Sequence, residues 1–168
     1  MAELTASERL QPSLLDRLID DEPDKKDEPL SRRVMSMVML RRAVLRDLSN
    51  LLNCPSKPQF DEINEYPLAA RSVLNYGMPD LTGLTASGVS PSRIVSMVRD
   101  AIHHYEPRIV GQTLDVRVVE SAGSDGVRNG FAFEISGQLC PLPMPEALYV
   151  RTEIDLETGR FDIKERRA

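Results

Sequence analysis

Residues 150–163, Val-Arg-Thr-Glu-Ile-Asp-Leu-Glu-Thr-Gly-Arg-Phe-Asp-Ile, decide the fold that we expect for this chain of 168 residues. Apolar and polar side chains alternate on both sides of Glu157-Thr158-Gly159. An alternation with a period of two is typical of a strand that is buried on one face, and a short Gly-containing segment between two such runs indicates a hairpin. The C-terminal part of the chain is therefore predicted to form two antiparallel strands.

Two earlier segments, residues 114–118 and 131–135, show the same alternation. Ser124-Asp125-Gly126 joins them, and prolines at 141, 143 and 145 separate the second segment from the C-terminal pair. These runs predict an antiparallel sheet of three or four strands. Charged residues from Lys164 to Arg167 are typical of a strand at the edge of a sheet, because charge protects an edge from random pairing.

Two long helices are predicted before the sheet. In residues 32–53 apolar side chains recur at steps of three and four, and Ser31 is placed to cap the helix start. The second helix begins at Ser90-Pro91 and ends at Glu106-Pro107, because the residue before a proline avoids the helical conformation. The buried faces are expected to hold Val34, Met37, Val38, Leu40, Val44, Leu45, Leu48, Leu51 and Leu52 in the first helix and Ile94, Val98, Ala101, Ile102 and Tyr105 in the second. The fold class is α+β, with N-terminal helices and one central helix packed on the sheet.

The polar side of helix 32–53 carries Arg32, Arg33, Arg42 and Arg46. These arginines form either a solvated face or a docking face for an acidic partner. Residues 54–90, between the two helices, are expected to be irregular. Within them, Gly77 is predicted to adopt a positive φ angle in a turn.

Residues 1–30 differ from the rest of the chain in charge. They hold nine acidic and four basic residues, whereas residues 31–168 hold seventeen of each. Residues 10–20 predict a short amphipathic helix capped by Ser13, and residues 21–30 predict an acidic linker. This helix has two open alternatives, docking on its own chain or on a partner. We therefore expect an N-terminal helix and linker over 1–30 and a single domain over 31–168.

The composition excludes several classes of protein. The neutral body lacks the concentrated basic surface that nucleic-acid binding needs, so no nucleic acid partner is expected. No apolar stretch approaches the ~18 residues of a membrane-spanning helix, and Met1–Leu10 has no signal-peptide core, so we expect a cytoplasmic protein without membrane insertion. Cys54 and Cys140 are expected to be free thiols.

No catalytic, cofactor-binding or metal-binding pattern is visible in the sequence. His103 and His104 are adjacent on the predicted helix, so their side chains diverge and suit a helix end better than a metal. The nucleotide-binding and hydrolase motifs are absent. We therefore expect no cofactor, no metal and no catalytic residue.

One pair of carboxylates is a candidate glycosidase site. Glu106 at a helix end and Asp115 in a strand can approach to the separations that glycosidases use. However, Arg108 follows closely, and a fixed cation favours an ionised neighbouring carboxylate, which is the wrong state for a general acid.

Glu106-Pro107-Arg108 places two opposite charges on a stiff corner between a helix and a strand. One interpretation is an internal pairing of Glu106 with Arg108. The other is an exposed charged corner that inserts into a partner, where arginine can bind a carboxylate or helix-terminal carbonyls.

The sequence resembles the TssE family, the type VI secretion baseplate wedge subunits related to phage tail baseplate wedge proteins once labelled lysozyme-like. The most specific segments are Leu-Asn-Tyr-Gly-Met-Pro-Asp at 74–80 and Glu-Pro-Arg at 106–108. The others that carry the resemblance are residues 9–18, 44–48, 51–53, 66–67, 72–83, 105–109 and 151–159. Together these segments follow one order over nearly the whole chain.

The resemblance implies a structural role with defined partners. Family members are implied to join the wedge proteins TssF and TssG and to contact the first sheath layer, built from TssB and TssC. Glu106, Pro107 and Arg108 are implied to dock on the helical core of the wedge. The sheet is implied to offer an edge to incoming sheath strands, and the terminal strand at Phe161 and Ile163 is our candidate edge.

The function expected from the sequence is therefore a non-enzymatic baseplate subunit that links the TssF–TssG wedge to the contractile sheath and helps to start sheath assembly. It would lie in the cytoplasm at the inner face of the cell envelope. The alternatives are a peptidoglycan-cleaving lysozyme-like glycosidase and a regulatory adaptor of related fold.

Overall fold

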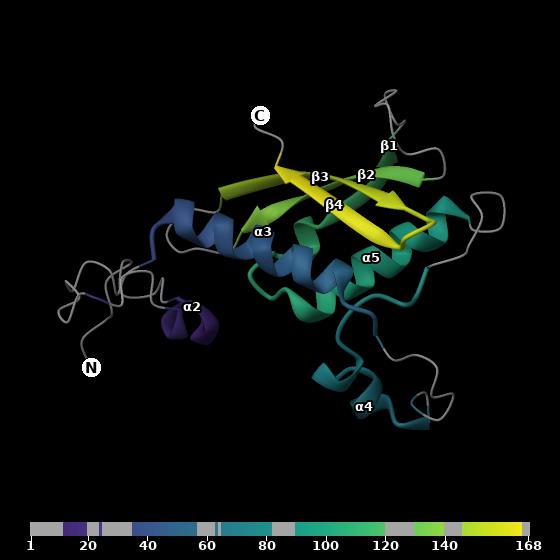
Figure 1. Cartoon of the computed structure of the whole chain (residues 1–168), viewed down its shortest axis with the longest axis horizontal. Coiled ribbons are helices and arrows are strands. Elements are labelled where there is room, and N and C mark those ends of the chain that lie inside the picture. Colours follow the sequence, from purple (N-terminus) through teal and green to yellow (C-terminus); the bar gives the residue numbers. More distant parts are fainter. Residues whose placement is uncertain are drawn as a thin grey trace.

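The computed structural model describes residues 12–19, 24, 35–56, 63, 65–81, 90–119, 130–139 and 146–165. The helical elements are α2 (Leu14–Leu18), α3 (Met37–Asn53), α4 (Pro67–Ala70), η3 (Val73–Asn75), α5 (Pro91–Tyr105) and η4 (Gly111–Thr113). The strands are β1 (Asp115–Val119), β2 (Gly130–Leu139), β3 (Glu146–Asp155) and β4 (Arg160–Glu165). Figure 1 shows α3 and α5 below the sheet, with α4 projecting away from it. The predicted α+β class is confirmed.

The four strands form one antiparallel sheet in the order β1-β2-β3-β4. The hairpin between β3 and β4 turns at Gly159, which has a φ of 67°. The predicted alternation holds in these two strands, where Val150, Thr152, Ile154 and Phe161 are buried. The third strand is longer than predicted and begins at Glu146. The prediction that the terminal strand is an edge is confirmed, since β4 pairs only with β3 among the described strands.

The first long helix is shorter than predicted. It begins at Met37, and the hydroxyl of Ser36 rather than Ser31 caps it by accepting a hydrogen bond from the Met39 N–H at 3.2 Å. Val38 was expected on the buried face, but its side chain is 70% exposed. At 100° per residue, Val38 lies about 120° from the centre of the buried stripe, so the expected face was too wide. The expectations for Ser31, Arg32, Arg33 and Val34 lie outside the described residues.

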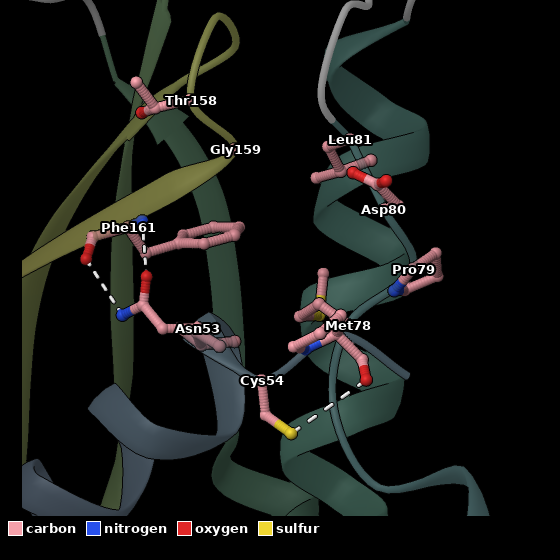
Figure 2. A pocket seen from close by; sticks show the side chains of 11 residues that line it. Asn53, Cys54, Met78, Pro79, Asp80, Leu81, Thr158, Gly159 and Phe161 are labelled. Atoms are coloured by element: carbon pink, nitrogen blue, oxygen red, sulfur yellow. Dashed lines mark hydrogen bonds between the residues drawn. The ribbon is translucent and has the colours of Figure 1, made fainter. Parts of the chain in front are cut away.

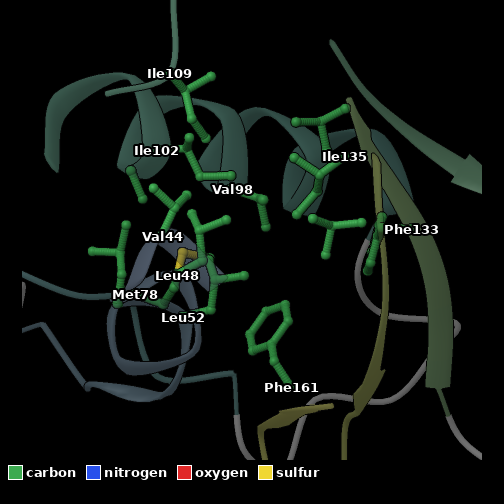
Figure 3. Packing of buried hydrophobic residues seen from close by; sticks show 14 of the residues in the cluster. Val44, Leu48, Leu52, Met78, Val98, Ile102, Ile109, Phe133, Ile135 and Phe161 are labelled. Atoms are coloured by element: carbon green, nitrogen blue, oxygen red, sulfur yellow. The ribbon is translucent and has the colours of Figure 1, made fainter. Parts of the chain in front are cut away.

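The second long helix agrees with its prediction. Pro91 occupies its first turn after Ser90, and Glu106 ends it. In Figure 3, Val44 and Leu48 of α3 lie beside Val98 and Ile102 of α5. Phe133 and Ile135 belong to the same core cluster and come from the sheet. Burial of these side chains holds both helices on one face of the sheet.

The segment between the helices is joined to the end of α3 by two backbone hydrogen bonds. The Met78 N–H donates to the Cys54 carbonyl at 2.8 Å, and the Ser56 N–H donates to the Met78 carbonyl at 2.7 Å. Gly77 has a φ of 119°, as predicted, and a Cβ there would lie 2.2 Å from the Cys54 oxygen. Glycine is therefore required where the chain passes the end of α3.

Several predicted features lie outside the described residues: the turn at 124–126, the prolines between the second and third strands, and Cys140. Of the predicted linker at 21–30, only Asp24 is described. Among the described helices, none has the length and apolar character needed to cross a bilayer.

Candidate partner-binding site

The corner at residues 106–110 is fixed between α5 and β2. The Glu106 N–H still bonds to the Ile102 carbonyl at 2.9 Å, and the Val110 N–H bonds to the Gln138 carbonyl at 2.8 Å. Gly137 allows this approach, because a Cβ there would lie 2.9 Å from Cγ2 of Ile109. The corner therefore has little freedom to change its shape.

The two charges of the corner pair with each other. Glu106 is only 3% exposed. Arg108 donates from Nε to Glu106 Oε1 at 2.6 Å and from Nη2 to Oε2 at 2.5 Å, and its backbone N–H also bonds to Oε1 at 3.2 Å. This two-pronged geometry is the strong form of an arginine–carboxylate pair.

Asp47 of α3 completes the arrangement. Its Oδ2 accepts a hydrogen bond from Nη2 of Arg108 at 2.7 Å. Burial alone lowers the pKa of Arg108, but the hydrogen bonds and charges of Glu106 and Asp47 outweigh it and raise the pKa above its ordinary value. Arg108 therefore stays charged, with its side chain 26% exposed.

The ionic contacts continue outward from Asp47. Arg46 pairs with Asp47 Oδ1 at 2.8 Å and, through Nη1, with Asp16 of α2 at 2.6 Å. Burial raises the pKa of Asp16, but the Ser13 hydroxyl and Arg46 together lower it below its ordinary value. We call the series Glu106, Arg108, Asp47, Arg46 and Asp16 the ionic chain.

The ionic chain involves two features for which the sequence leaves alternatives open: the docking of the N-terminal helix and the pairing of Glu106 with Arg108. The short N-terminal helix, α2, contacts its own chain through Asp16, while its apolar side chains remain exposed: Leu14, Leu15, Leu18 and Ile19. The internal pairing of Glu106 with Arg108 is present, so Glu106 is not an exposed charge, and only Pro107 and part of Arg108 reach the surface.

The two carboxylates of the candidate glycosidase site have different arginine partners. Asp115 is 57% exposed in its side chain and lies 3.6 Å from Arg99, whereas Glu106 is enclosed by Arg108. Among the described residues, no three histidine, cysteine, aspartate or glutamate side chains converge as metal ligands would.

An apolar projection lies next to the corner. The segment of α4 and η3 exposes Tyr66, Leu68, Val73 and Leu74. It is joined to the end of α5 by the Tyr105 hydroxyl, which donates to the Ser72 carbonyl at 3.1 Å, and by edge contact of the Tyr76 and Tyr105 rings at 5.3 Å.

The second predicted site is the edge strand β4, where the side chains of Phe161 and Ile163 point inward, as the alternation predicts. Phe161 is buried with its ring in the core, and Ile163 is half-buried. What these residues present at the edge is backbone. The Phe161 N–H donates to Asn53 Oδ1 at 2.9 Å, and Asn53 Nδ2 donates back to the Phe161 carbonyl at 3.0 Å (Figure 2).

Sequence reasoning assigned no role to Asp47 or Asn53. A signal for Asp47 was present, because at 100° per residue it falls on the apolar stripe of its helix, and a carboxylate there needs a cationic partner. Asn53 gave no such signal, since it lies on the polar side of the helix end.

Comparison with known families places the chain among the structural components of phage-tail-like baseplates. The matching family model is described as baseplate wedge protein gp25 and covers residues 38–140, so the chain belongs to that family. The resemblance to TssE is thereby confirmed, because TssE belongs to the same family. The match includes the corner but ends before β3 and β4. No curated protein and no solved structure matches the chain.

Proposed function

We propose that this chain is a structural subunit of a type VI secretion baseplate that joins the TssF–TssG wedge to the first TssB–TssC layer of the contractile sheath. Residues 31–168 would act as one domain, in the cytoplasm at the inner face of the cell envelope. Membership of the baseplate wedge family supports this assembly role.

The observation that carries the proposal is the set of donors left on Arg108. Its Nε and Nη2 are committed to Glu106 and Asp47, whereas Nη1 makes no hydrogen bond to any residue that the structure describes. The two N–H groups of Nη1 are available to helix-terminal carbonyls or a carboxylate of the wedge. Pro107, exposed beside it, keeps the corner stiff.

The second contact is the proposed sheath edge on β4. Phe161 and Ile163 would contribute their outward backbone groups, and the partner would add a strand to the sheet. Wedge and sheath contacts would then lie on different parts of the molecule, as a linking subunit requires.

Capture of TssF–TssG on immobilised protein tests the wedge contact. Arg108→Lys is the informative variant, because alanine would leave Glu106 buried without its partner. Lysine keeps the positive charge but lacks the planar guanidinium group with its several N–H donors, so we expect binding about tenfold weaker. Arg93→Lys, at an exposed arginine of α5, the helix that precedes the corner, is the control and should bind normally. Unchanged binding by folded Arg108→Lys would refute docking through the corner, and absence of wild-type capture would refute the function.

A further inference from the structure

We propose that the Asn53 side chain is a removable cap on the edge of β4, and that it occupies the place of a peptide group from an incoming strand. This inference rests on the proposed sheath contact and adds to it how that edge is closed before the strand arrives.

The cap imitates a neighbouring strand in its chemistry. A carboxamide carries one carbonyl acceptor and one N–H donor side by side, as a peptide group does. Asn53 uses both on a single residue, accepting from the Phe161 N–H and donating to the Phe161 carbonyl. In an antiparallel ladder, a residue exchanges this same pair of bonds with its partner on the next strand.

The bonded groups of Phe161 are those that face away from the sheet. Phe161 lies opposite Ile154 of β3, but its single N–H is given to Asn53, so this pair is a non-hydrogen-bonded one. Backbone direction alternates along a strand, and Ile163 therefore turns its N–H and carbonyl outward as well. Within the described residues, no side chain caps Ile163 as Asn53 caps Phe161.

Space for a strand lies on both sides of the cap. One hollow of about 320 Å³ is lined by Asn53, Cys54, Met78 and Phe161 (Figure 2). A second, of about 660 Å³, runs along β4 and is lined by Ser49, Asn50, Asn53 and Ile163 among others. Asn53 borders both hollows, and its withdrawal would join them along the outer side of β4.

The cap is held weakly enough to be exchanged. Asn53 is exposed, so its carboxamide can return to water when it leaves Phe161. Its Nδ2 also bonds to the Ser49 carbonyl at 2.9 Å, which gives it a second partner within its own helix. An incoming strand would restore both bonds of Phe161, so no backbone group is left unpaired.

The far end of the edge is closed differently. Arg41 binds the carboxylate of Glu165 at 2.8 Å and also binds Glu146 and the Ala147 carbonyl. A strand entering beside Phe161 and Ile163 would therefore meet an ionic contact at Glu165. This limits the added strand to a short pairing centred on Ile163.

Affinity for the TssB–TssC complex, measured with full-length protein, tests the cap. Asn53→Ala removes the competitor of the incoming strand while the bonds of the bound state stay the same. We expect Asn53→Ala to bind about threefold to tenfold more tightly than wild type, since a net hydrogen bond is worth that factor. Asn50→Ala is the matched control, because Asn50 lines the same groove without bonding to β4, and it should bind like wild type.

Hydrogen exchange at the Phe161 amide gives a readout that needs no partner. Asn53→Ala should speed exchange at Phe161 relative to Asn50→Ala, and addition of TssB–TssC should slow it in every variant. Asn53→Ala binding equal to or weaker than wild type would overturn the cap, whatever the exchange result.

A variant of the edge itself separates this inference from the proposed function. Ile163→Pro removes one outward N–H, and Glu165→Pro serves if that variant does not fold. If wild type binds the sheath complex and the proline variant does not, the edge contact stands, and Asn53→Ala alone decides the cap. If neither wild type nor Asn53→Ala binds, both proposals fail. If Asn53→Ala dimerises and Ile163→Pro abolishes the dimer, the occupant is a second copy and the inference is overturned.

Discussion

The corner at Glu106–Arg108 and the edge at Phe161 both have polar groups bonded within the chain. The bonds of the corner are buried, whereas those of the edge are made by an exposed side chain. At the corner, the carboxylate of Glu106 is 3% exposed and bound by Arg108, which also reaches Asp47. At the edge, the backbone of Phe161 is bound by Asn53, a neutral side chain in contact with water. Both regions therefore have polar groups that are already bonded within the chain before any partner arrives.

The difference determines what each region can give to a partner. Removing one member of a buried ion pair costs about 3–5 kcal/mol, because a charge is left without compensation. Exchanging a neutral, exposed hydrogen bond costs about 1 kcal/mol or less. The corner must therefore bind with its unused donors and keep its internal bonds, whereas the edge can release its internal bonds and form new ones.

The largest effect is expected at the corner. Glu106→Ala leaves Arg108 half-buried, with Asp47 as the one carboxylate bound to it among the residues that the structure describes. We expect the free energy of unfolding to fall by about 3 kcal/mol, the lower end for buried pairs because Arg108 is partly exposed. Urea denaturation followed by circular dichroism measures this. Glu157→Ala, at an exposed hairpin residue, is the control and should change stability by less than about 0.5 kcal/mol. Equal effects of the two substitutions would remove the distinction between corner and surface.

Asp47 tests whether the corner behaves as a unit. Asp47→Ala should lower the free energy of unfolding by about 1.5 kcal/mol, less than Glu106→Ala because Arg108 keeps its two-pronged partner. In a double-mutant cycle with Arg108→Ala, we expect a coupling energy of about 1 kcal/mol. Strict additivity would show that Asp47 and Arg108 act independently and that the ionic chain is not a network.

The contrast between these regions was only partly readable from the sequence. Alternation fixed the strands near Phe161, and the three- and four-residue steps fixed the face with Leu48, because both patterns record burial locally. The burial of Glu106 was not readable, since it depends on where α3 brings Asp47, a residue about sixty positions earlier. Periodicity places Asp47 on an apolar stripe, where it needs a cationic partner, but it does not indicate which distant residue that partner is.

The smaller errors also came from contacts between segments that lie far apart in the sequence. Ser31 and Ser36 are both good capping residues, and the choice between them depends on where the helix meets the core rather than on residue type. Asn53 was missed because a polar residue at a helix end is common and its partner, the backbone of Phe161, is invisible in a sequence. Side chain-to-backbone contacts between distant elements are the part of a site that sequence patterns record least.

A substitution at the edge should lower the free energy of unfolding less than one at the corner. Asn53→Ala removes two hydrogen bonds to Phe161, but water can replace both, so we expect a loss of about 1 kcal/mol in the free energy of unfolding. Thermal unfolding followed by circular dichroism, beside Asn50→Ala as the control, measures the difference. A loss as large as that of Glu106→Ala would mean that Asn53 is a structural contact of the buried kind and would contradict its exchangeability.

The smallest effect on stability is expected at the outer end of the ionic chain, where Arg46 meets Asp16. This pair is ionic, like the corner, but its exposure is closer to that of the edge, so it separates the effect of charge from the effect of burial. The Arg46 side chain is 34% exposed where it meets Asp16, so the pair should contribute less than about 0.5 kcal/mol. The pKa of Asp16 is lowered in the folded state, so this contribution is present above about pH 3.8, its ordinary value, and is lost as the pH falls through the lower folded value. Nuclear magnetic resonance of the α2 amides between pH 6 and 2.5 should show the α2 signals shifting toward those of a detached helix at the acidic end, and Asp16→Asn should show the shifted signals at every pH. If α2 in Asp16→Asn keeps the wild-type signals, the ion pair does not hold α2 against α3. Exposure to water would then make the Arg46–Asp16 pair too weak to matter, although its charges are those of the corner.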